Sequence, residues 1–284
     1  MDIEFKEKTF EKHFGHELAR LTNITFSPDQ CDEEILGFDE AFFIPERWLF
    51  RIAPYVRGRR RARIHGIDPR TFNHIGEDLA RLLPDFRFNL FVQFKRPVYL
   101  TSRGAGQWQD WKQSYYRYAT TPHQQEALER IEAQSYGRAA AVYASPAFWR
   151  ADDLWAHVRS GVVVDNSNMA AAGKLKGHGC YSYVSAGFSG KGHSETVDIE
   201  SDPLPTIIGT GLERNERLPL NQHLKKAAAA IVEATSGSDT VTPVFQQVRT
   251  ALGIEEFDPN SLASAIEMIE AFSDAFGVRY TAMG

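Results

Sequence analysis

The chain has 284 residues, of which 43% are hydrophobic and 24% are charged, and its formal net charge is -5. These values are ordinary for a globular protein and exclude a globally basic nucleic-acid-binding protein, although a local basic face remains compatible with them. The two cysteines, Cys31 and Cys180, exclude a disulfide framework and a cysteine-based zinc site.

The N-terminal segment MDIEFKEKTFEKH is charged and lacks the apolar region of a signal peptide. No run in the sequence approaches the roughly 18 apolar residues that a membrane-spanning helix needs. The sequence therefore predicts a cytoplasmic protein with no membrane partner.

The first third of the chain mixes regular and irregular segments. Apolar residues at helical spacing predict a helix over 6–22, and two apolar runs around a polar turn predict a β-hairpin within 23–44. Residues 45–87 are charged and irregular, apart from a helix expected near 71–83. A central buried strand is expected over 88–100.

The middle of the chain alternates between strand and helix patterns. A helix is expected over 122–136, followed by a strand at 138–145, a helix at 151–160 and a strand at 161–165. This order implies crossover connections and a mixed sheet with helices on its outside. The expected fold class is therefore α/β.

The last third changes character near 202–213, where two prolines and a glycine cluster. Before it, a strand is expected over 180–188, in a segment rich in Gly, Lys and Ser. After it, helices are expected over 221–235, 243–252 and 261–276. We therefore expect a first domain over 1–205, containing an insertion at 45–87, and a helical C-terminal extension over 206–284.

The central strand, FNLFVQFKRPVYL, carries two polar side chains on one face. Because side chains alternate along a strand, Gln93 and Lys95 point to the same side. An ammonium group seldom lies in an apolar strand unless an anion accompanies it. The alternative is that Lys95 is an edge-strand charge that prevents aggregation. The apolar residues on both sides of it favour a central strand.

Two carboxylates precede this strand in the chain. Glu17 lies at the edge of the apolar stripe of the first helix, three residues after Phe14. Asp39 lies inside the apolar run LGFDEAFF, where its desolvation would be costly without a cation. Each has a simpler interpretation: Glu17 as a solvated boundary residue, and Asp39 as a turn residue after Gly37.

Together these residues suit a metal-dependent phosphodiesterase. Mg²⁺ prefers oxygen ligands and is usually held by one or two carboxylates together with waters and substrate phosphate. Glu17, Asp39 and the amide oxygen of Gln93 would bind Mg²⁺ or Mn²⁺. Lys95 would orient or activate the attacking water and neutralise charge that builds on phosphorus.

This arrangement resembles the PD-(D/E)XK nuclease superfamily, which has the restriction-endonuclease-like fold. Glu17 matches the helix acid of that family, Asp39 the hairpin acid, and Gln93-Phe94-Lys95 the acid-x-Lys element. The resemblance covers roughly residues 6–165. It implies a mixed β-sheet flanked by helices, catalytic roles for Glu17, Asp39, Gln93 and Lys95, and a magnesium-dependent endonuclease activity.

The chain departs from the family pattern in two places. Gln93 replaces the second acid, a Gln-x-Lys form that also occurs among type IV restriction-like enzymes and anti-phage nuclease effectors. Asp39 and Lys95 are widely separated, so 45–87 must be an insertion. Gln124 lies where related nucleases often place a substrate-facing glutamine, which implies contact with nucleic acid.

A basic run lies inside the insertion and is a candidate for phosphate contact. Its members are Arg57, Arg59, Arg60, Arg61 and Arg63. The alternative is a solvated loop that pairs with acidic neighbours. The aromatic residues over 108–118 can stack on bases, but dense aromatics more often pack in a core.

The sequence thus predicts a metal-dependent nuclease that acts on DNA, and the resemblance implies an effector subunit of a bacterial anti-phage system. The C-terminal helices would contact a protein partner or a second copy of the chain. One alternative is a catalytically inactive nuclease-like scaffold or adaptor, in which Gln93 marks the loss of metal binding. Another is a nucleic-acid-binding protein that relies on the arginine run alone.

Overall fold

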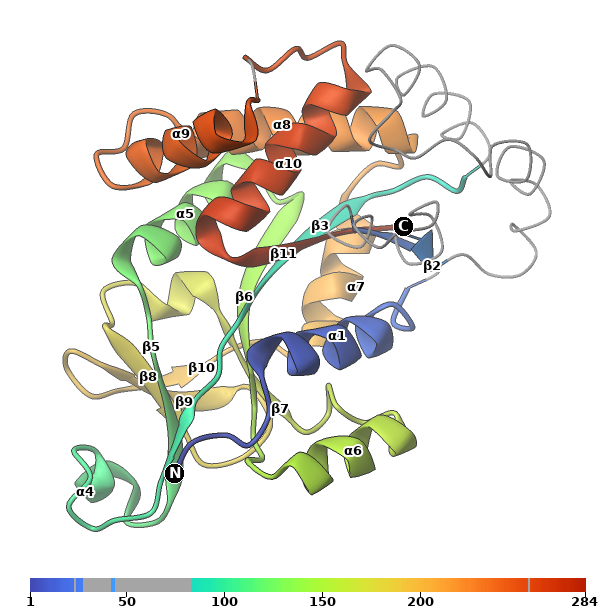
Figure 1. Ribbon diagram of the computed structural model, residues 1–284. Coiled ribbons are helices and arrows are strands. Elements are labelled where there is room, and N and C mark those ends of the chain that lie inside the picture. Colours follow the sequence, from blue (N-terminus) through green and yellow to red (C-terminus); the bar gives the residue numbers. More distant parts are fainter. Residues whose placement is uncertain (23, 28–41, 44–82, 255) are drawn as a thin grey trace. The chain divides into compact units, whose positions relative to one another are not determined.

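The computed structural model describes residues 1–22, 24–27, 42–43, 83–254 and 256–284 (Figure 1). The fold is mixed α/β, with two mostly antiparallel sheets flanked by helices. Within the described residues, no helix is both long and apolar enough to cross a membrane. The chain divides into two compact units, each assembled from segments that are distant in sequence.

Unit 1 comprises Met1–Leu21, Val92–Glu129 and Ala141–Ile207. Four elements begin in one unit and end in the other, namely β3 (Phe88–Phe94), α5 (Pro122–Gln134), β6 (Ala139–Pro146) and α7 (Leu204–Arg214). The remaining elements of unit 1 are α1 (Glu7–Leu18), β4 (Val98–Leu100), α4 (Trp108–Trp111), β5 (Tyr115–Ala119), α6 (Ala151–Ser160), β7 (Ser167–Ala171), a short 3-10 helix η3 (Ala172–Leu175), β8 (Cys180–Tyr183), β9 (Ser189–His193) and β10 (Val197–Glu200).

A five-stranded antiparallel sheet in unit 1 has the strand order β10-β9-β8-β5-β4. Tyrosines stand opposite one another across its strands, with Tyr99 paired to Tyr116, Tyr116 to Tyr183, and Tyr118 to Tyr181. The rings of Tyr99 and Tyr116 stack at 4.6 Å, and those of Tyr116 and Tyr183 at 5.3 Å. Aromatic cross-strand pairs stabilise a sheet, so this ladder accounts for much of the aromatic cluster of the sequence.

The second sheet contributes β3, β6 and β7 to unit 1, in that order. The first helix, α1, packs on this sheet through Phe10, Phe14 and Leu18, which are fully buried and lie on one helix face. The rings of Phe10 and Phe14 meet Phe94 of β3 edge-on, with centroids 5.8 and 5.3 Å apart. This aromatic contact fixes α1 on the face of β3 to which Phe94 points.

Unit 2 comprises Thr22–Phe91, Arg130–Ala140 and Ile208–Gly284. Its sheet has the order β2-β1-β11-β3-β6. Its helices α8, α9 and α10 pack against one another (Figure 1). The elements that belong to this unit alone are β1 (Thr25–Phe26), β2 (Phe42–Phe43), α8 (Leu220–Thr235), α9 (Val241–Leu252), α10 (Leu262–Phe276) and β11 (Val278–Met283).

The core of unit 2 forms where α10 meets the first half of β3. Phe91 of β3 contacts Phe272 of α10 at 5.6 Å and Tyr280 of β11 at 5.3 Å between ring centroids. All three side chains are buried. The helical tail of the chain is therefore part of a packed core in unit 2, because α10 covers β3 and β11.

Several expected elements are confirmed within a few residues of their bounds. They are the first helix, the helices that became α5 and α6, the strand that became β6, and the three C-terminal helices. The expected hairpin is confirmed where it is described, since β1 and β2 pair antiparallel. Most of the insertion expected at 45–87, including the helix near 71–83, lies outside the described residues.

The strand expected over 88–100 is wrong as a single element. β3 ends at Phe94, and β4 begins at Val98 in the other sheet of unit 1. Pro97 lies between them, and proline lacks the N–H that a continuing ladder needs. The chain therefore leaves the sheet directly after Gln93-Phe94-Lys95.

The strand expected over 161–165 is also wrong, and so is a crossover after α6, whereas a crossover through α5 is confirmed. β3 and β6 are neighbours that run parallel, since the Asn89 N–H bonds to the Arg138 carbonyl and the Lys95 N–H to the Ala144 carbonyl. Gly161 adopts a left-handed φ of 66° and ends α6. Turns then follow, with the Asn166 N–H bonded to the Val162 carbonyl at 3.1 Å. The next strand, β7, begins at Ser167 and pairs antiparallel with β6. Both α7 and the strand β11 were not predicted.

Truncation of Phe14 should destabilise the protein, because its ring is fully buried between α1 and β3. We expect Phe14→Ala to cost about 3–5 kcal/mol of unfolding free energy. Denaturant unfolding followed by far-ultraviolet circular dichroism would measure it. The matched control is Leu21→Ala, whose side chain is 42% exposed and should cost no more than about 0.5 kcal/mol. Equal losses for the two variants would contradict the packing of α1 on β3.

Candidate functional site

The candidate site lies in unit 1, where β3 leaves the sheet. All seven residues of β3 are buried, Gln93 included, and Lys95 is the first residue after the strand. The Lys95 N–H still bonds to the Ala144 carbonyl of β6 at 2.9 Å, and Ser145 Oγ donates to the Lys95 carbonyl at 3.1 Å. The backbone of Lys95 is therefore held as firmly as the strand itself.

Strand alternation places Lys95 on the face of the sheet opposite to α1. Phe94 points toward α1, so Gln93 and Lys95 point to the other face. That face carries α5, whose Gln124 contacts Lys95, and Tyr143 of β6. The sequence prediction that Gln93 and Lys95 share a face agrees with this geometry, and Gln124 lies beside Lys95.

The Lys95 ammonium is held by an amide and by an aromatic ring. Its Nζ donates to Gln124 Oε1 at 3.1 Å and lies 5.5 Å from the centroid of the Tyr143 ring. Burial lowers the pKa of Lys95 from its ordinary value, and the carboxylate of Glu7 opposes that shift. The amine is therefore partly desolvated but stays close to one negative charge.

Glu7, in the first turn of α1, is that negative charge. Its Oε2 accepts a hydrogen bond from the backbone N–H of Arg96 at 3.0 Å. Burial raises the pKa of Glu7, while the Lys95 charge and the Arg96 N–H lower it. Glu7 and Lys95 are thus electrostatically coupled, and each favours the charged form of the other.

A second layer of hydrogen bonds positions Tyr143 and α5. The Tyr143 hydroxyl donates to Gln125 Oε1 at 2.7 Å, and burial raises the pKa of that hydroxyl. Gln125 Nε2 donates to the Ala172 carbonyl at 2.7 Å and to Glu129 Oε1 at 2.9 Å. The side-chain amide of Gln125 is therefore fully engaged, which anchors α5 at the residue next to Gln124.

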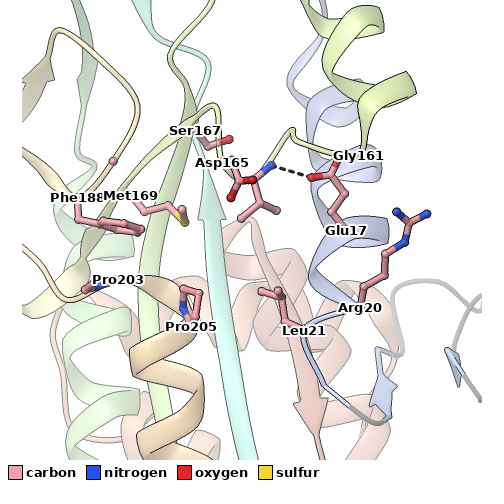
Figure 2. A pocket seen from close by; sticks show the side chains of 12 residues that line it. Glu17, Arg20, Leu21, Gly161, Asp165, Ser167, Met169, Phe188, Pro203 and Pro205 are labelled. Atoms are coloured by element: carbon pink, nitrogen blue, oxygen red, sulfur yellow. Dashed lines mark hydrogen bonds between the residues drawn. The ribbon is translucent and has the colours of Figure 1, made fainter.

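Glu17 occupies a different environment from Lys95. Its two carboxylate oxygens accept the backbone N–H groups of Val163 and Val164, each at 2.9 Å. It lines a cavity of about 370 Å³ together with Arg20, Asp165 and apolar residues that include Met169 and Phe188. Figure 2 shows the carboxylate directed at the loop that follows α6. Glu17 therefore ties α1 to this loop.

The remaining predicted site residues lie outside the described residues. They are the hairpin acid Asp39 and the basic run Arg57, Arg59, Arg60, Arg61 and Arg63. Their predicted roles in metal binding and phosphate contact stay predictions.

Metal binding can be tested only against the described donors. The oxygen donors near Lys95 are the carboxylate of Glu7 and the amide oxygens of Gln93 and Gln124. The Gln124 oxygen already accepts a hydrogen bond from Lys95. Outside the gaps at 23, 28–41, 44–82 and 255, no group of three or more His, Cys, Asp or Glu residues is arranged to hold a metal ion. The described donors alone therefore do not fit a magnesium centre, and Asp39 would have to complete one.

Sequence reasoning missed Glu7 and Tyr143. A signal for Glu7 was present, because it lies three residues before Phe10, just as Glu17 lies three residues after Phe14. Both acids therefore border the same apolar stripe, and periodicity does not choose between them. Tyr143 carried no such signal, since its place beside Lys95 depends on the pairing of β3 with β6.

Removal of the Glu7 charge should lower the pKa of Lys95 further. The carboxylate is the group that opposes the effect of burial on Lys95, so Glu7→Gln leaves burial unopposed. Carbon-13 NMR titration of lysine side chains would follow the pKa, with Lys95→Arg identifying the Lys95 signal. Glu195→Gln, an exposed substitution in the same unit, is the control and should leave the signal unchanged. An unaltered Lys95 pKa in Glu7→Gln would contradict the coupling.

Comparisons with protein-family models, with curated proteins and with solved structures found no match to this chain. The interpretation of the site therefore depends on its own residues. In the described part of the chain these are a partly desolvated lysine at the end of a buried strand, an amide that holds it, and a coupled carboxylate.

Proposed function

We propose that this chain is a metal-dependent nuclease that hydrolyses DNA phosphodiester bonds, with Lys95 as its catalytic lysine. The supporting observation is the position of Lys95, whose amine is partly buried at the end of β3 yet donates to one side-chain acceptor, Gln124, within the part of the chain that the structure describes. An ammonium has three donors, so two N–H groups remain available to a phosphate oxygen. The restriction-endonuclease-like fold is part of the same proposal.

The chemistry of Lys95 suits charge stabilisation. In phosphodiester hydrolysis negative charge builds on the phosphoryl oxygens, and a fixed cation in a partly desolvated site stabilises it more than water does. The lowered pKa of Lys95 also makes its neutral amine more accessible, which would help it to orient or activate an attacking water. Glu7 would set the balance between the two charge states.

The proposed activity requires a metal ion, and residues predicted from the sequence would hold it. Mg²⁺ or Mn²⁺ would be held by Asp39 and by the amide oxygen of Gln93. Glu17, whose carboxylate binds the loop after α6 in a different environment from Lys95, is not part of the proposed metal site. The metal would supply charge neutralisation on the phosphate.

The biological setting proposed is an effector subunit of a bacterial anti-phage system. Helices α8, α9 and α10 would contact a protein partner or a second copy, and the arginine run 57–63 would contact the DNA backbone. An effector that is active only in a complex would also protect the host from an unregulated nuclease.

Cleavage of supercoiled plasmid tests the proposed activity. With Mg²⁺ or Mn²⁺ and any operon partner present, wild type should nick or linearise the plasmid. Lys95→Ala should lower the rate by at least about 100-fold, as the loss of a charge-stabilising group does. Lys8→Ala, whose side chain is 84% exposed on α1, should cut like wild type. Equal cutting by wild type and Lys95→Ala would contradict a catalytic role for Lys95.

A second candidate is a nuclease-like scaffold without catalysis. It is favoured by the engagement of Glu17 with backbone N–H groups and by the lack of a three-acid cluster among the described residues. In this case Gln93 marks a site that has lost its metal.

Calorimetry with Mn²⁺ separates the two candidates. The nuclease proposal expects a binding heat for wild type that Asp39→Ala abolishes, because the hairpin acid is the principal charged ligand. Glu195→Gln serves as the control and should retain the heat. A wild-type protein that gives no heat would favour the scaffold.

A further inference from the structure

Unit 2 contains a cavity of about 210 Å³, and none of the residues that line it belongs to the Lys95 site. The alanines of α8 form an apolar wall. The polar lining has two cations, Arg138 and Lys226, one acid, Glu233, and the uncharged side chains of Asn89, Gln134, Ser135, Tyr136 and His223. We name it the Arg138 pocket. Its volume suits a small polar group, and the charges and hydrogen-bonding groups of its side chains indicate the chemistry of that group.

Two cations of the Arg138 pocket share one exposed carboxylate. Arg138 Nη2 lies 2.7 Å from Glu216 Oε1, and Lys226 Nζ lies 3.0 Å from the same oxygen. The Glu216 side chain is 59% exposed, whereas that of Arg138 is only 23% exposed. A single oxygen of a solvated carboxylate thus occupies the position between two cations, which is where a phosphate would bind most strongly.

Arg138 has donor capacity that Glu216 does not satisfy. Its Nη1 group is buried and has no hydrogen-bond partner among the residues that the structure describes. Buried guanidinium N–H groups are costly to leave without an acceptor, and an acceptor with several oxygens removes that cost. A phosphate has such oxygens and matches the planar fork of arginine.

His223 makes one wall of the pocket neutral. Burial, together with the charges of Arg138 and Lys226, lowers the pKa of His223 to about 3. Its Nε2 lies 2.7 Å from Asn89 Oδ1, which also accepts the Tyr280 hydroxyl at 2.6 Å. The neutral ring therefore donates through Nε2, and its Nδ1 is a hydrogen-bond acceptor suited to a hydroxyl group.

Tyr136 supplies an aromatic surface at the mouth of the pocket. Its side chain is 82% exposed, and its φ of 50° lies in the left-handed region that favours glycine. Glycine or asparagine would end α5 at this position without strain. A strained and exposed aromatic residue beside a cation-lined pocket is therefore better explained by a ligand ring than by folding.

We propose that the Arg138 pocket binds a mononucleotide, with the phosphate between Arg138 and Lys226 and the base stacked on Tyr136. The phosphate displaces Glu216 from the two cations and brings an acceptor to Arg138 Nη1. The sugar hydroxyls lie toward the neutral His223. This binding site is independent of the proposed nuclease activity, because none of its residues belongs to the Lys95 site.

Isothermal titration of the full chain with AMP, inorganic phosphate and adenosine tests the proposal. AMP should bind more tightly than phosphate, and adenosine should bind most weakly, because both the cations and the ring contribute. Arg138→Gln should weaken AMP binding about tenfold or more, since it removes a charge-assisted contact. Arg214→Gln, an exposed arginine outside the pocket, is the matched control and should bind AMP like wild type.

Two further variants separate binding from folding. Glu216→Gln should raise the affinity for AMP several-fold, because the competing carboxylate is gone, whereas a purely structural ion pair would give no gain. Tyr136→Gly relieves the left-handed φ and should retain the fold, yet lower the affinity for AMP to that for phosphate. No binding of AMP to wild type, or weaker binding by Glu216→Gln, would overturn the proposal. Equal affinities of wild type for AMP and phosphate would overturn the assignment of a nucleotide.

Discussion

The burial of β3 along its whole length is the constraint on which both units depend. A strand with every residue buried is expected to be apolar, yet β3 carries Asn89 and Gln93 and is followed at once by Lys95. Buried polar groups are stable only when they are hydrogen-bonded. The hydrogen-bonding partners of Asn89 and Lys95 come from helices and a strand that are distant in the sequence, namely α8, β11 and α5.

The polar side chains at the two ends of β3 find their hydrogen-bonding partners in different ways. In unit 2, Asn89 Oδ1 accepts from His223 and Tyr280, which are both buried, and the result is an uncharged hydrogen-bond network. In unit 1, Lys95 keeps a charge at the boundary of the core and is balanced by Gln124 and Glu7. A satisfied hydrogen-bond network contributes to the rigidity of a fold, whereas a charge at the boundary of a core is also available to the charge of a ligand.

Local patterns in the sequence were sufficient for the elements whose signal is local. Helical periodicity located α1, α6 and α8, and alternation placed Gln93 and Lys95 on one face. The break at Pro97 was visible in the sequence but was outweighed by the apolar run around it. By contrast, β11 and the partnership of Lys95 with Glu7 arise from contacts between distant segments. Periodicity marks Glu7 and Glu17 alike, and only the packed structure separates a carboxylate beside Lys95 from one that binds the loop after α6.

The place of β11 has a consequence for how the chain folds during synthesis. β11 lies between β1 and β3 in the sheet of unit 2, with Thr25 opposite Met283 and the Arg87 N–H bonded to the Met283 carbonyl at 2.8 Å. Residues 278–283 leave the ribosome long after β1 and β3, so both of those strands keep an unpaired edge until β11 has been synthesised. Such edges are templates for aggregation, so a chaperone that covers the edges of β1 and β3 during synthesis would protect unit 2.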